Sequence, residues 1–126
     1  LIMRIKEDSQ FDYASPYWTN DDTLNSGRMD EVSGVDVKLP AFMSAQLNGI
    51  RICVTLPTNC YTYLLGDTYG SARALFSQGY VRTADMNQRA FEELWAPGVH
   101  DQRTNHMNCL QKPGFNTGCR GGNRAR

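Results

Sequence analysis

The stretch at residues 50–65, IRICVTLPTNCYTYLL, constrains the fold more than any other part of the chain. Its β-branched and aromatic residues favour a pleated, half-buried strand surface. Pro57 cannot donate to a sheet ladder, so Pro57-Thr58-Asn59 is expected to form a turn between two strands. The pattern therefore predicts a β-hairpin at about 50–65.

This hairpin places Cys53 and Cys60 on opposite arms, where cross-strand neighbours come within disulfide distance. Cys109 and Cys119 form a second local pair around a Pro-Gly turn. Four cysteines allow several connectivities, and the sequence does not choose among them. Disulfides would indicate an oxidising compartment, and four reduced thiols in a cytosolic protein are the alternative.

Two short helices are expected after the hairpin, at about 70–78 and 85–95. Ser71 or Thr68 can cap the first helix, and Gly79 stands where it would end. The second helix carries a Met–aromatic stripe, which is typical of core packing rather than of a cofactor site. With an apolar strand expected in residues 1–6 and loop-rich ends, the sequence predicts an α+β fold around a central, mostly antiparallel sheet.

The chain of 126 residues is one domain's worth of sequence, and we expect a single domain over 1–126. Basic and acidic residues balance at 13 each, so no overall field favours nucleic acid or an anionic membrane as a partner. The longest charge-free stretch, residues 52–66, is too short and too polar for a membrane span. The sequence shows no signal-peptide pattern, and its opening on Leu1 suggests a piece of a longer domain.

Catalytic and metal-binding constellations receive little support. His100, His106 and Cys109 could form a thiol site, but they lie beside a second cysteine and lack a glycine-flanked nucleophile turn. With Cys119 they offer four zinc ligands, but at spacings unlike common structural zinc sites. We therefore predict no catalytic residue, no metal site and no enzymatic activity.

Two polar clusters have simple alternatives to ligand binding. Asn20, Asp21 and Asp22 are suitable ligands for a hard cation such as calcium, but they equally suit a turn or a helix cap, and no calcium-loop spacing follows. Three arginines near the end of the chain suit an anion, yet a solvated tail explains them more simply. These are Arg120, Arg124 and Arg126.

Aromatic residues give the main candidates for ligand binding. Tyr and Trp combine an apolar face with a polar group, so exposed rings can stack on sugars. The alternative is that the rings pack in the core, which is the stronger reading for the tryptophan. The candidates are Tyr17, Trp18, Tyr61 and Tyr63.

Several motifs, taken in order, resemble the fibrinogen-like C-terminal domain of secreted invertebrate and protist lectin or matrix proteins. LIMRIK followed by FDYASPYWTNDDTLN is similar to the opening of that domain, and KLPAF, IRICV and CLQKPGFNTGC follow in the same order. The sharpest parts are YWTNDDTLN and GFNTGC. Similarity to the intelectin branch is distant.

The resemblance implies an α+β fold, secretion, disulfides and recognition of carbohydrate or partner proteins without catalysis. The family's calcium and ligand sites lie in a C-terminal part that this chain does not include, so no cofactor is expected in this fragment. We expect a secreted, non-enzymatic, lectin-like module that binds a glycan or glycoprotein. The alternative is a structural subunit of an extracellular filament or matrix, whose partners are neighbouring copies or other extracellular chains.

Overall fold

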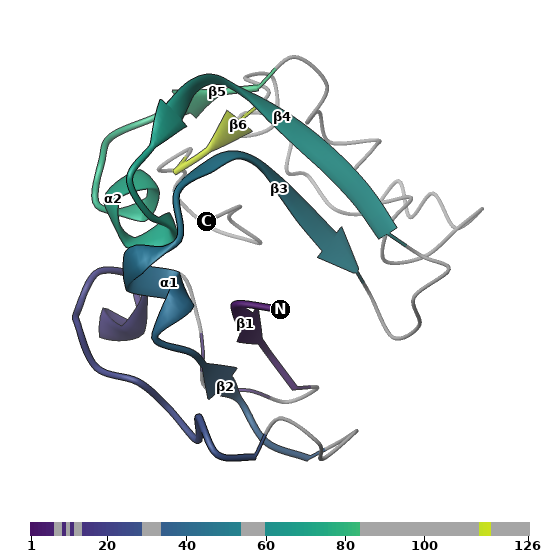
Figure 1. Ribbon diagram of the computed structural model, residues 1–126, viewed down its shortest axis with the longest axis vertical. Coiled ribbons are helices and arrows are strands. Elements are labelled where there is room, and N and C mark those ends of the chain that lie inside the picture. Colours follow the sequence, from purple (N-terminus) through teal and green to yellow (C-terminus); the bar gives the residue numbers. More distant parts are fainter. Residues whose placement is uncertain are drawn as a thin grey trace, which may run out of the picture. The chain divides into compact units, whose positions relative to one another are not determined.

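The computed structural model describes residues 1–6, 9, 11, 14–28, 34–53, 60–83 and 114–116. This part of the chain combines short helices with antiparallel strands, so the predicted mixed α+β class is confirmed (Figure 1). The chain divides into two compact units. The first comprises Leu1–Leu47 and Tyr69–Gln78, and the second comprises Asn48–Thr68 and Gly79–Arg126.

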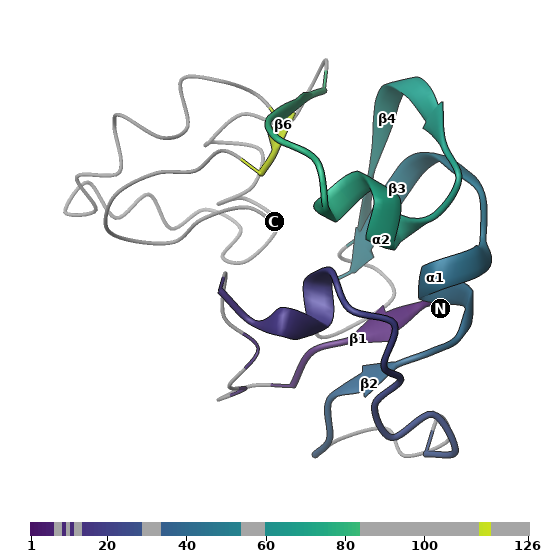
Figure 2. The same ribbon diagram turned by 90° about the vertical axis from the view of Figure 1, so that its left-hand side faces the viewer.

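The first unit contains a small sheet centred on one residue, Lys38. Strand β1 (Met3–Arg4) pairs antiparallel with β2 (Val37–Lys38), and Met3 lies opposite Lys38 (Figure 2). On the other side, Leu24 exchanges two backbone hydrogen bonds with Lys38, at 2.8 and 3.0 Å. The backbone of Lys38 therefore lies between two neighbouring segments. Their pairing fixes the position of its Cα atom, from which the side chain extends.

The helix predicted at about 70–78 is present as α2 (Ala72–Phe76). Ser71 caps it as expected, because its Oγ accepts a hydrogen bond from the Ala74 amide at 3.0 Å. The prediction that Gly79 ends this helix is wrong. Ser77 is the C-cap, and its amide bonds back to the carbonyls of the last turn, so the helix closes before the glycine is reached.

Two further helical turns lie in segments that the sequence left as loop or unassigned. The 3-10 helix η1 (Pro16–Trp18) begins with a proline, whose fixed φ and missing N–H suit a first helical position. Helix α1 (Ala41–Ser44) has Pro40 as its N-cap and packs against α2 (Figure 1). Within the described ranges, no helix is long and apolar enough to cross a membrane.

The core of the first unit is aromatic. Trp18 packs against Phe76 with ring centroids 4.9 Å apart, and Phe42 stacks on Phe76 at 5.9 Å. Phe11 meets the edge of Trp18 at 5.2 Å. Such pairs contribute about 0.5–1.5 kcal/mol each beyond the area they bury. These contacts join η1, α1 and α2 around one cluster.

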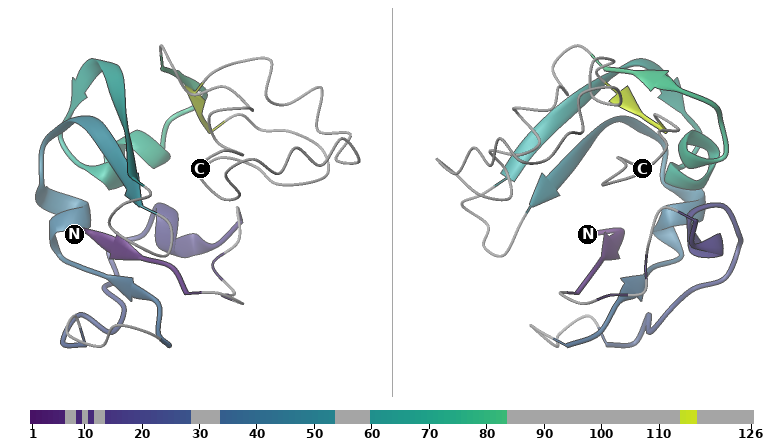
Figure 3. Two further views of the ribbon diagram at one scale, coloured as in Figure 1. Left: turned by 90° about the vertical axis from the view of Figure 1, so that its right-hand side faces the viewer. Right: turned by 180° about the vertical axis from the view of Figure 1, so that it is seen from behind.

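The predicted hairpin is confirmed by β3 (Leu47–Cys53) and β4 (Cys60–Tyr69), which run side by side (Figure 3). Its arms extend past the predicted limits of 50 and 65, so Thr68, a predicted helix cap, lies in β4. The turn at Pro57-Thr58-Asn59 lies outside the described residues.

The second unit adds a short ladder beside this hairpin. Leu65 of β4 forms a bridge with Thr83, and β5 (Val81–Arg82) pairs antiparallel with β6 (Gly114–Phe115). The described strands thus form three two-stranded antiparallel sheets in place of one central sheet. Four of these strands are two residues long, so each pairs over a minimal ladder.

Gly114 is required where β6 meets β5. Its φ of +154° lies in a region that L-residues rarely adopt, and a Cβ there would clash with the carbonyl oxygen of Val81. The same Cβ would approach the ring of Tyr80 to 2.9 Å. Any side chain at this position would therefore displace one strand from the other.

Other predictions concern parts of the chain outside the described residues. They are the helix at about 85–95, the Cys109–Cys119 pairing, the thiol and zinc constellations with His100 and His106, and the arginines Arg120, Arg124 and Arg126.

Candidate functional site

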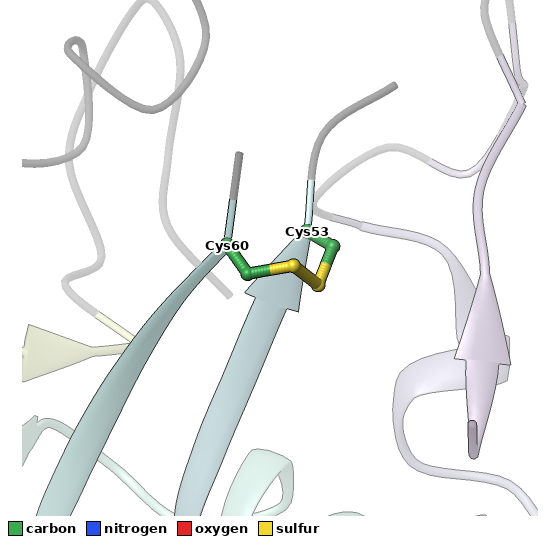
Figure 4. Close-up of a disulfide and its surroundings, with 2 residues drawn as sticks. All are labelled: Cys53 and Cys60. Atoms are coloured by element: carbon green, nitrogen blue, oxygen red, sulfur yellow. A yellow bond between two sulfur atoms is a disulfide. The ribbon is translucent and has the colours of Figure 1, made fainter. Parts of the chain in front are cut away.

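A disulfide closes the end of the β3–β4 hairpin, as the sequence predicted. Cys53 ends β3, Cys60 begins β4, and their Cα atoms lie 4.0 Å apart (Figure 4). The two cysteines are seven positions apart in sequence. Their bond joins the last residue of β3 to the first residue of β4. The bond therefore holds the ends of the two arms together covalently.

The disulfide also sets which side chains share a face of the ribbon. With Cys53 opposite Cys60, antiparallel pairing places Gly49 opposite Leu64, and a Cβ on Gly49 would indeed lie 3.8 Å from the Leu64 Cα. Because side chains alternate between faces, the disulfide and Leu64 share one face. Leu64 is 63% exposed there.

The opposite face of β4 carries Tyr61, Tyr63 and the buried Leu65. Tyr63 has no exposed surface, and its ring meets Phe115 edge-on at 6.2 Å. Tyr61 contacts the Tyr63 ring at 4.8 Å and remains 42% exposed. The exposed ring of Tyr61 thus rests on a buried ring at the clamped end of the hairpin.

The Tyr63 hydroxyl is buried and has no hydrogen-bond partner in the described part of the chain. Burial, and to a lesser extent the neighbouring Tyr61, raises the pKa of Tyr63 because both disfavour the phenolate. Tyr63 therefore stays protonated at neutral pH, and its ring contributes packing to the second unit.

Tyr17 and Trp18 both lie in η1 of the first unit. Trp18 is 7% exposed and belongs to the aromatic core, whereas Tyr17 is half-buried and stacks on Phe11 at 5.4 Å. Of the four predicted ligand-binding residues, only Tyr17 and Tyr61 keep ring surface that a sugar could cover. Trp18 and Tyr63 are core residues, and their rings are too buried for a sugar to stack on them.

A second polar site, which sequence reasoning missed, surrounds Lys38. Its side chain is fully buried, and Nζ donates to both the backbone carbonyl oxygen and the side-chain Oδ1 of Asn20, each at 2.8 Å. Nζ also lies 5.0 Å from the Phe42 ring centroid and 5.9 Å from that of Tyr17, within cation–π range. The apolar neighbours of Lys38 in Val-Lys-Leu were the only local signal of its burial.

Electrostatics at Lys38 are dominated by its removal from water. Burial lowers the pKa of Lys38; the carboxylates of Asp22 and Asp21 oppose this shift, and Arg73 adds to it. Its amine is therefore more readily deprotonated than an exposed lysine.

The Asn20-Asp21-Asp22 cluster is engaged by protein groups. Asn20 Nδ2 donates to Asp22 Oδ2 at 2.7 Å, and Arg73 forms an ion pair with Asp21 at 2.9 Å. With Lys38 on both Asn20 oxygens, these contacts use oxygens that a bound cation would need. The geometry favours the turn interpretation of this cluster over the calcium interpretation.

Comparisons of this chain with protein-family models, with curated proteins and with solved structures found no match. The resemblance to fibrinogen-like domains therefore remains a prediction from the sequence motifs alone.

Proposed function

We propose that this chain is a secreted, non-enzymatic, lectin-like module that recognises a glycan or a glycosylated matrix protein through the exposed ring of Tyr61. The observation that carries this proposal is the position of that ring, 42% exposed and supported from below by buried Tyr63. A ring held in this way offers an apolar face to a sugar at little cost in side-chain entropy.

The disulfide supports both the compartment and the rigidity that this function needs. Disulfides such as Cys53–Cys60 persist mainly in oxidising environments, which fits secretion. The bond lies next to Tyr61 in sequence, so it limits movement of the strand that carries the ring. A preorganised surface loses less free energy on binding than a mobile one.

A glycan array, probed with the full chain in the presence and absence of calcium, tests this function. Tyr61→Ala should weaken binding to any recognised glycan by about tenfold, which corresponds to about 1.4 kcal/mol. Tyr80→Ala is the matched control, because Tyr80 is also 42% exposed and also lies in the second unit. Equal binding by the Tyr61 variant and the control, or no bound glycan at all, would contradict the proposal.

A second candidate, a structural subunit of an extracellular filament or matrix, is favoured by the other face of the hairpin. Leu64 is 63% exposed beside the disulfide, and β3 pairs only with β4 within the described residues. The edge of β3 that faces away from β4, with exposed Leu64 on the adjoining strand, can accept a strand from another chain. Sedimentation velocity over a concentration series tests this: self-association abolished by Leu64→Lys would favour the structural role over the lectin role.

A further inference from the structure

The environment of Lys38 brings together an amine, a carboxamide and a carboxylate from a single compact unit. Lys38 Nζ lies 2.8 Å from Asn20 Oδ1, and Asn20 Nδ2 donates to Asp22 Oδ2 at 2.7 Å. The carboxamide carbon is one C=O bond, about 1.2 Å, from Oδ1, so Nζ lies within about 4 Å of it. We propose that Lys38 and Asn20 become joined by an intramolecular isopeptide bond, with Asp22 as the proton carrier.

The chemistry is a redox-neutral amide exchange. The lone pair of neutral Lys38 Nζ attacks Cγ of Asn20 and forms a new C–N bond, while the Cγ–Nδ2 bond breaks. Nζ gives up one proton and Nδ2 gains one, so the amide nitrogen leaves as ammonia. Asp22 already accepts a hydrogen bond from the departing nitrogen and is placed to relay that proton.

The surroundings of Lys38 favour attack of its amine on the carboxamide of Asn20. Attack needs the neutral amine, and the complete burial of the Lys38 side chain disfavours the ammonium form. The fully buried position of Lys38 also keeps solvent away from the attacking amine. Amine and carboxamide are held in contact by the fold, which replaces a bimolecular encounter with a local one.

The backbone on both sides of the reacting pair is fixed. Lys38 is bonded to Leu24 on one side and lies opposite Met3 on the other. The Asn20 amide bonds to the Pro16 carbonyl at 3.0 Å, which ties it to η1. An isopeptide bond here would join β2 covalently to the turn after η1. This site is independent of the lectin-like function proposed above.

Peptide mapping of the purified full chain by mass spectrometry tests the proposal. The linked protein should be lighter than its sequence by one ammonia molecule. Trypsin should release the peptide 7–28 joined to an uncut peptide 29–51, because a modified Lys38 is no longer a cleavage site. An asparaginyl succinimide also loses ammonia, so the branched peptide decides the question. Separate peptides 7–28, 29–38 and 39–51 alone would overturn the proposal.

Variants separate the three roles. Lys38→Met removes the nucleophile and Asn20→Ser removes the electrophile, so neither variant should yield the branched peptide. Asn20→Ser does not alter a fully buried position, so it still tests the proposal if Lys38→Met fails to fold. Asp22→Ala should lower the linked fraction at least tenfold. Asp21→Ala is its matched control, because Asp21 pairs with Arg73 and its removal should not lower the linked fraction. Equal linkage in the two aspartate variants would overturn the role given to Asp22.

Discussion

Replacing Tyr63 by Phe should stabilise this protein. The Tyr63 side chain is fully buried, and its hydroxyl finds no partner in the described part of the chain. A buried hydroxyl without a hydrogen bond costs roughly 1–3 kcal/mol, whereas the ring contacts with Tyr61 and Phe115 do not involve the oxygen. We therefore expect Tyr63→Phe to raise the free energy of unfolding by about 1–2 kcal/mol.

Urea denaturation at neutral pH, with the disulfide intact, measures this difference as a shift in midpoint at constant slope. Tyr61→Phe is the control, because an exposed hydroxyl should change the free energy of unfolding by less than about 0.5 kcal/mol. A loss of about 1 kcal/mol or more in Tyr63→Phe would refute the reasoning, since it would mean that the hydroxyl makes a stabilising hydrogen bond in the folded protein.

Two further predictions concern the second unit. Burial raises the pKa of Tyr63 above 10.0, so above that pH the unfolded chain loses this proton first and stability falls as pH rises. Urea midpoints from about pH 9 to about pH 11 should therefore fall more steeply in the wild type than in Tyr63→Phe, and parallel curves would contradict the burial of this phenol. Gly114→Ala should cost about 2–4 kcal/mol, because its Cβ meets the Val81 carbonyl, whereas Gly79→Ala, which meets open space, should cost less than about 1 kcal/mol. Equal losses in these two glycine variants would show that β5 and β6 do not pair as described.

Local patterns predicted the parts of the fold that depend on neighbouring residues. The β-branched run and the Cys53–Cys60 pair lie within a few residues of one another and predicted the clamped hairpin. The Ser71 cap likewise depends on the next turn of chain. The end of that helix was misplaced because Ser77 could close the last turn without the left-handed residue that a glycine cap supplies.

Distant contacts account for what the sequence did not predict. Asn20 and Lys38 lie 18 positions apart, and Asp21 and Arg73 lie 52 apart, so no periodicity links them. A lysine in the sequence is expected at the surface, and only tertiary packing shows that Lys38 is buried among rings. For the same reason, the sequence could not separate buried from exposed aromatic rings.

The Cys53–Cys60 disulfide is the observation from which both the proposed secretion and the proposed rigid Tyr61 surface are argued. Thiol trapping of the natively produced protein with an alkylating reagent, followed by mapping of the tryptic peptide 52–73 that contains Cys53 and Cys60, tests it. We predict that neither sulfur is alkylated until a reductant is added. Recovery of both cysteines as alkylated thiols without reductant would contradict the account.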